Sequence, residues 1–175
     1  ADEYDRSFLK LNPHLAIITS VDADHLDIYK NANAMHEAFA EFANKVSESG
    51  AVFLHSGIGL SAKAKEINYS LDDNTADLYA TNLYIENGTY IFDVVYKGKT
   101  LGTVRSPYPG HHNITNAIAA IGIGLEMGIE WKKIVDSIGT FAGVKRRFEY
   151  HIKRDDRVYI DDYAHHPTEI KACVG

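Results

Sequence analysis

An acidic loop with one histidine follows the first apolar run of the chain. The run covers residues 15–21, and Asp22, Asp24, His25 and Asp27 come directly after it. An α/β sheet places its functional sites at the carboxyl ends of its parallel strands. Carboxylate oxygens suit Mg²⁺, and an imidazole can supplement them. The loop is therefore a candidate metal site; the alternative is a polar loop whose aspartates form turns and cap the next helix.

Two asparagines stand at the expected start of a helix, just after Gly110. Asn113 and Asn116 are three residues apart, so both can lie on one face of that helix. A carboxamide donates and accepts hydrogen bonds, which matches the edge of an adenine base. The pair is a candidate nucleotide site, and an ordinary asparagine cap of the helix is the alternative.

A basic turn follows Gly143. Lys145, Arg146 and Arg147 are consecutive there, and the chain around them reads as a break between two folded units. A planar guanidinium suits phosphate oxygens, so the turn is a candidate phosphate-binding segment. A solvated basic turn with no ligand is the alternative.

A loop near the C-terminal end gathers several groups that can bind or react. Asp162, Tyr163, His165 and His166 follow the expected strand at residues 157–161. Asp162 can accept hydrogen bonds from a ribose diol, and Tyr163 can stack on a base. The alternative is a capped turn between a strand and a helix.

The elements that must position these groups follow from the apolar pattern. Residues 15–21 and 51–54 are short apolar runs typical of buried strands, and apolar side chains recur at helical spacing between residues 35 and 46. A strand, a helix and a strand in this order predict a parallel βαβ unit. Residues 76–84, 90–96 and 100–105 are separated by turn signals, which predicts a small antiparallel meander.

The second half of the chain is predicted to contain two helices and another sheet. Helical stripes occur at residues 114–125 and 131–138, and each ends near a glycine. Residues 147–151 and 157–161 alternate around a polar turn and predict two paired strands. The change in composition at residues 143–149 indicates a domain boundary.

Composition excludes several classes of protein. The chain has 175 residues, of which 45% are hydrophobic and 24% charged, so it can bury a core and is not disordered. No apolar run approaches the ~18 residues of a membrane span. The single cysteine, Cys173, excludes an intrachain disulfide, and a net charge of −6 argues against nucleic acid and anionic membranes as partners. We expect a cytoplasmic protein.

Five segments of the chain, in this order, resemble the Mur ligases. They are residues 1–9, 22–29, 109–117, 143–148 and 161–169. The last four contain, in order, Asp24-His25-Leu26-Asp27, His112-Asn113-Ile114-Thr115-Asn116, Gly143-Val144-Lys145-Arg146-Arg147-Phe148 and Asp162-Tyr163-Ala164-His165-His166-Pro167. The resemblance implies an α/β fold: an incomplete central domain of P-loop type at residues 1–148, with a mostly parallel sheet and a small antiparallel β meander. The start of an α/β C-terminal domain would follow at residues 149–175.

The resemblance also implies a reaction. Mur ligases use ATP and Mg²⁺ to activate a UDP-muramoyl carboxylate as an acyl phosphate, which an amino acid then attacks to form an amide. The sequences of the first and last segments, residues 1–9 and 161–169, resemble the branch of the family that joins L-alanine to UDP-N-acetylmuramate. Oligomer formation is compatible with this reading. The implied metal ligand is His25, and the implied catalytic residues are His25, Arg147 and His165. The implied nucleotide contacts are Asn113 and Asn116 for adenine, Arg146 and Arg147 for the phosphates, and Asp162 for the ribose. Tyr163 and His165 would lie near the nucleotide and the incoming amino acid.

The chain departs from the family pattern in ways that bear on activity. It contains no G-x-x-x-x-G-K-[ST] phosphate loop, and it does not begin with Met. We therefore expect a piece of a longer protein that is inactive by itself. Other readings of the same residues are a muropeptide-recycling or other Mur ligase, a metal-dependent phosphohydrolase, and a non-catalytic nucleotide-binding module.

Overall fold

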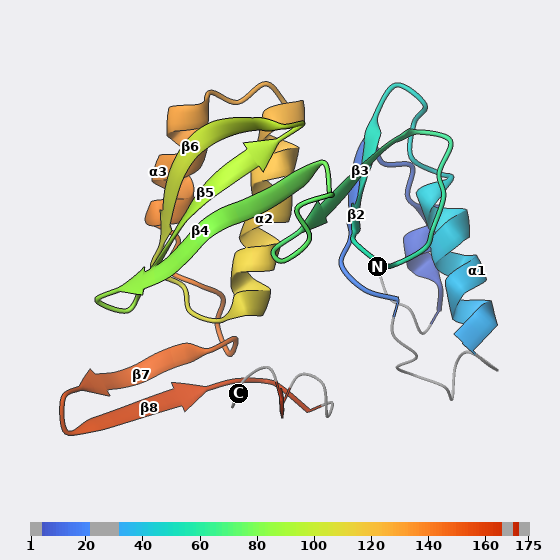
Figure 1. The fold of residues 1–175 in the computed structure, drawn as a ribbon. Helices are drawn as coiled ribbons and strands as arrows, with labels where there is room; N and C mark the ends of the chain where they lie inside the picture. The colour runs from blue at the N-terminus through green and yellow to red at the C-terminus, as the bar shows by residue number, and fades with distance from the viewer. Residues whose placement is uncertain (1–4, 22–31, 166–169, 172–175) are drawn as a thin grey trace.

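The computed structural model describes residues 5–21, 32–165 and 170–171. It contains a six-stranded sheet with helices on both faces and a separate two-stranded ribbon (Figure 1). The described elements are, in order, η1 (Ser7–Lys10), β1 (Leu15–Ile18), α1 (Ala32–Ala43), β2 (Ala51–His55), β3 (Lys65–Ser70), β4 (Leu78–Glu86), β5 (Thr89–Tyr96), β6 (Lys99–Ser106), α2 (His111–Glu126), α3 (Trp131–Gly139), β7 (Glu149–Arg154) and β8 (Arg157–Asp161).

The main sheet has the strand order β1-β2-β3-β4-β5-β6. The pairs β1–β2, β2–β3 and β3–β4 are parallel, which confirms the predicted βαβ unit. The predicted antiparallel meander is also present, because β4–β5 and β5–β6 pair antiparallel. The meander continues the parallel part of the sheet through a short β3–β4 pairing, so both parts share one core.

The strand β3 did not stand out in the sequence. It alternates polar and apolar residues, and only Ile67 and Tyr69 bring large apolar side chains into the core. With two such positions in six residues, the apolar signal was too weak to separate this strand from a loop. Its position is nevertheless central, since it joins β2 to the meander.

Strand β2 is the centre of the core because both of its faces are covered. Phe53 packs with α2 and α3 on one face, whereas Val52 and Leu54 pack on the other face with α1 and with residues that follow it. Figure 1 shows α2 and α3 behind the meander and α1 beside the parallel strands. Helix α2 approaches the sheet so closely that a Cβ at Gly122 would lie 2.3 Å from the Phe53 ring.

A polar network attaches the end of α2 to the sheet. The Lys65 ammonium of β3 donates to both carboxylate oxygens of Glu126, at 2.8 and 2.7 Å, and the Tyr96 hydroxyl of β5 donates to the same carboxylate at 2.6 Å. Burial raises the pKa of Glu126, but the bonds from Lys65 and Tyr96 outweigh it, so the net pKa is lowered. The network fixes the far end of the helix whose first turn belongs to the candidate site.

The ribbon β7–β8 confirms the predicted second pair of strands. Its strands are antiparallel, with Glu149 opposite Asp161. Every residue of both strands is described, and none of them is buried. None of the helices in the described part of the chain is both long and apolar enough to cross a membrane.

Candidate functional site

Three segments that are far apart in the sequence meet between the main sheet and the ribbon. They are the first turn of α2, the turn at residues 143–148, and the segment at residues 161–165 that leaves β8. These are the segments in which the sequence placed its adenine, phosphate and ribose candidates. The structure brings together Arg146, Arg147, Asp162, Tyr163 and His165. Asn113 and Asn116 lie on the first turns of α2, whose His112 is within electrostatic reach of Asp162 and Arg147.

The first turn of α2 presents backbone amides rather than a side-chain cap. The N-cap residue is Gly110, with φ +99° and no side-chain hydrogen bond to the helix. Asn113 is thus not the N-cap, and its amide nitrogen donates back to the Pro109 carbonyl at 2.5 Å. Asn116 is exposed one turn later. An uncapped helix N-terminus attracts anions, because its amides and its dipole both favour negative charge.

The pKa of His112, in the first turn of α2, depends on charged groups of this junction. Partial burial lowers the pKa of the imidazole; Asp162 opposes that shift and Arg147 adds to it. An imidazole on α2 is thus within electrostatic reach of a carboxylate after β8 and a guanidinium of the basic turn. The sequence did not single out His112 as a site residue, since only the fold brings the three segments together.

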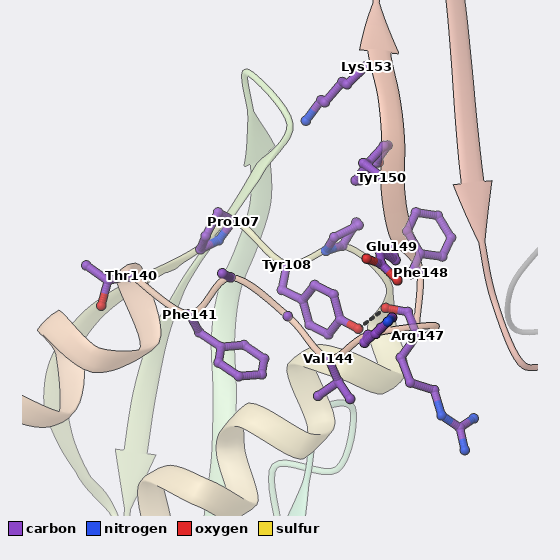
Figure 2. Close-up of a pocket in the computed structure, with 15 residues that line it drawn as sticks. Pro107, Tyr108, Thr140, Phe141, Val144, Arg147, Phe148, Glu149, Tyr150 and Lys153 are labelled. Carbon is purple, nitrogen blue, oxygen red and sulfur yellow. Dashed lines mark hydrogen bonds between the residues drawn. The ribbon is translucent and has the colours of Figure 1, made fainter.

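The basic turn has an unusual backbone. Gly143, Arg146 and Phe148 have φ values of +91°, +59° and +50°. A Cβ at Gly143 would lie 2.7 Å from the Tyr108 ring, so glycine is needed there for both its conformation and its size. The Tyr108 hydroxyl donates to the Arg147 carbonyl, as Figure 2 shows. These contacts fix the path of the chain between the main sheet and the ribbon.

Asp162 joins the basic turn to the end of β8. One of its carboxylate oxygens accepts from the Phe148 amide and the other from the Ala164 amide, both at 2.7 Å. The Tyr163 amide donates to the Arg146 carbonyl at 2.8 Å, which closes the junction from the other side. In this structure Asp162 therefore organises two backbone segments, whereas the sequence suggested a contact with a ribose.

Tyr163 lies beside both arginines of the turn. The Arg146 guanidinium carbon is 4.8 Å from the centre of its ring, and that of Arg147 is 5.9 Å away. The His165 ring packs edge-on against Tyr163 at 5.2 Å, and its Nδ1 lies 3.1 Å from the Tyr163 carbonyl oxygen. Arg146 also approaches Asp161, with 3.8 Å between Nε and Oδ2. Two cations, one aromatic ring and one imidazole thus share a small exposed surface.

A pocket of about 580 Å³ is lined by the basic turn together with the segments that follow β6 and α3 (Figure 2). Tyr108 and Phe141 pack edge-on at 5.4 Å in its wall, and Phe148 packs against Tyr150 at 5.7 Å. In Figure 2 the Arg147 side chain extends away from these rings. The pocket-lining aromatic residues were not candidates in the sequence, because isolated aromatic residues there look like ordinary core positions.

The predicted metal loop lies outside the described residues. This applies to Asp22, Asp24, His25 and Asp27, and also to His166. The roles of His25 in metal binding and catalysis therefore stay predictions.

Comparison with known proteins identifies the family. The sequence profile described as the Mur ligase middle domain matches residues 2–124. A UDP-N-acetylmuramate–L-alanine ligase from Christiangramia forsetii is 48% identical over 172 residues, covering 98% of this chain and 37% of that protein. The Aquifex aeolicus ligase of the same name is 39% identical over 181 residues, covering 100% of the chain and 40% of the relative. The chain thus spans less than half of the length of these relatives.

Solved structures share the fold. The crystal structure of the alanine ligase MurC from Thermotoga maritima superposes with a TM-score of 0.81 at 24% identity, covering 95% of this chain and 37% of that one. A MurF structure from Acinetobacter baumannii gives a TM-score of 0.78 at 21% identity, covering 95% and 37%. At these identities the likeness concerns the fold alone.

Proposed function

The chain belongs to the Mur ligase family, and on that premise we propose that it is the nucleotide-binding central part of an ATP-dependent ligase that joins L-alanine to UDP-N-acetylmuramate. The names of its relatives support this choice of substrates, since relatives from 48% to 39% identity carry the alanine-ligase name. In this proposal the described residues provide a surface that binds ATP. The part of the relatives that lies outside the matched region would bind the other substrates.

The observation that carries the proposal is the junction of α2, the basic turn and the segment after β8. ATP needs cations for its phosphates, an aromatic face or an amide for its base, and a firm backbone around it. Arg146 and Arg147 lie beside Tyr163. The first turn of α2 has no side-chain cap, and its His112 interacts electrostatically with Asp162 and Arg147 of the same junction. The residues present fit a nucleotide polyphosphate.

The chain's own residues have distinct tasks in this proposal. Arg147 holds phosphate oxygens, and Arg146, which lies closer to the Tyr163 ring, adds a second positive charge. Asn116 reads the adenine edge from its exposed position on α2. Asn113 keeps its carbonyl oxygen and one N–H available, because the other N–H of its amide is bonded to the Pro109 carbonyl. Asp162 acts as a positioning residue that holds the turn and the loop together.

Bound ATP supplies the phosphoryl group that activates the sugar carboxylate, and Mg²⁺ neutralises charge on the phosphates. We assign Mg²⁺ binding to His25. His165 would lie close to the incoming amino acid.

We also propose that the central domain ends at residue 148 and that a C-terminal domain begins at residue 149. The short turn between them matches a boundary at which two domains face one nucleotide.

The adenine role can be tested by kinetics of the intact protein. Replacing Asn116 with alanine removes about one hydrogen bond, worth ~1 kcal/mol, so the KM for ATP should rise roughly fivefold while the KM for alanine stays constant. Asn44→Ala is a matched control, because Asn44 is also exposed but lies just after α1 and bonds only to the Ala40 carbonyl. Equal changes in both KM values would show that Asn116 does not contact the nucleotide.

A further inference from the structure

Glu149, His151 and Asp161 form a compact group of metal-ligating side chains on the β7–β8 ribbon. The candidate ligand atoms of all three lie within 4.8 Å of one another. The His151 Nε2 atom is 3.9 Å from Glu149 Oε2 and 3.9 Å from Asp161 Oδ2. We propose that this group binds a divalent transition-metal ion of the Zn²⁺ type, separate from the magnesium proposed for the nucleotide.

Strand alternation and cross-strand pairing place the three side chains on one face. Glu149 and Asp161 are direct partners across the ribbon, so their side chains project from the same face. The register shifts between Tyr150 and Ile152, which makes His151 the extra residue of a bulge. Its ring lies 5.4 Å from that of Tyr159, which is two residues before Asp161 and therefore on the Asp161 face. His151 is two residues after Glu149 in β7, so alternation along the strand places both side chains on that face.

The chemistry of the donors selects the ion. One imidazole nitrogen and two carboxylate oxygens suit Zn²⁺, Mn²⁺ or Co²⁺, and Zn²⁺ binds such sites more tightly than Mn²⁺ or Co²⁺. Mg²⁺ instead prefers a set of oxygen ligands and keeps several waters. Two carboxylates also match the double charge of the ion, so a filled site would be close to neutral.

The geometry requires only a small closure. Ligands at about 2.1 Å from a tetrahedral Zn²⁺ lie about 3.4 Å apart. The two distances from His151 are 3.9 Å, so each must shorten by roughly half an ångström. The Glu149 and Asp161 carboxylates lie within 4.8 Å of each other, so their separation must shorten by at most about 1.4 Å. All three side chains are between 31% and 44% exposed, which leaves them room to move and leaves an open position for water.

Two neighbouring contacts compete with or assist the ion. The Arg146 guanidinium lies 3.8 Å from Asp161 Oδ2 and would have to turn away when the ion binds. Glu149 Oε2 accepts from the Arg146 amide at 2.8 Å, a bond that orients the carboxylate and can persist. Metal ligands are usually held by such outer contacts.

We expect the bound ion to hold together the first residue pair of the ribbon, Glu149 and Asp161. A two-stranded ribbon is marginally stable in water, and no residue of β7 or β8 is buried. An ion held by residues of both strands would close the ribbon next to Phe148 and Asp162, which form the junction described above.

The test is a calorimetric titration of the intact protein with Zn²⁺, in excess Mg²⁺ so that magnesium sites are filled. We expect one Zn²⁺ per chain that is lost in His151→Gln, with affinity falling by on the order of 100-fold or more, since even outer-shell changes cost 10–100-fold. Glu149→Gln and Asp161→Asn should also weaken binding. His36→Gln is the matched control, because His36 is exposed on α1.

Spectroscopy with Co²⁺ gives a second readout that does not depend on folding energies. Co²⁺ bound to the protein should show visible absorption of a four- or five-coordinate ion, and this band should disappear in His151→Gln but persist in His36→Gln. Absence of Zn²⁺ binding to the unmodified protein would overturn the proposal. Binding that is equally strong in the His151→Gln variant would overturn it as well.

Discussion

The two bonds of Asp162 lead to a prediction that can be worked out from the structure. Its carboxylate oxygens accept from the Phe148 and Ala164 amides at 2.7 Å each, in a part-buried position. Bonds to a charged group contribute about 1.5–3 kcal/mol each, and partial exposure favours the lower value. Asp162→Asn keeps one neutral acceptor, its carbonyl oxygen, and turns its amide NH2, which is a donor, toward the other backbone N–H. We therefore expect the junction to lose about 2 kcal/mol of stability.

Native-state hydrogen exchange of the intact protein measures this loss where it occurs. A loss of about 2 kcal/mol corresponds to a roughly 30-fold faster exchange of the Phe148 and Ala164 amides. The Ile114 amide in α2 should exchange at its original rate. Asp155→Asn is a matched control, because Asp155 is exposed at the tip of the same ribbon. Unchanged exchange of both amides in Asp162→Asn would refute the assignment of Asp162 as the residue that joins the two segments.

Three further predictions concern the core. Glu126→Gln should lower the free energy of unfolding by about 1–2 kcal/mol at pH 7, because it weakens the ion pair with Lys65. Since folding lowers the pKa of Glu126, this stabilisation is present above pH 4.5 and is lost as the pH falls further, so urea unfolding of the variant and the original should converge in acid. Gly122→Ala should cost about 1–3 kcal/mol or more, because its Cβ would overlap the Phe53 ring; wild-type thermal stability would contradict this. Tyr69→Phe should be neutral or stabilising in urea titrations, because the buried Tyr69 hydroxyl has no hydrogen-bond partner among the described residues; a loss above ~1 kcal/mol would reveal one.

Most of the fold was predictable because the strong apolar patterns are local. The runs at residues 15–21 and 51–54 became β1 and β2, and the turn signals at Asn87-Gly88 and Lys97-Gly98 mark the meander. The first expected strand was longer than β1, which ends at Ile18. The missing strand was β3, in which Lys65, Glu66 and Asn68 are exposed and whose place in the sheet is set by pairing with β2 rather than by its own sequence.

The candidate site was predictable in its residues but not in their tasks. The sequence identified the basic turn and the loop after β8, and the structure places Arg146 beside Tyr163. The sequence could not show that Asp162 bonds to two backbone amides, because those bonds depend on the positive φ values of Gly143, Arg146 and Phe148. Tyr108 was missed for a similar reason, since its contact with the Arg147 carbonyl is made across 39 residues of chain.

The most direct test of the proposed function is acceptor-dependent phosphate release by the intact protein. The protein would be incubated with ATP, Mg²⁺ and UDP-N-acetylmuramate, together with single amino acids or short peptides. We expect release that requires the sugar nucleotide and is greatest with L-alanine. Release only with a tripeptide would indicate a muropeptide-recycling ligase. Release without any acceptor would indicate a phosphohydrolase, and nucleotide binding without release would indicate a non-catalytic module; each of these results would contradict the proposal.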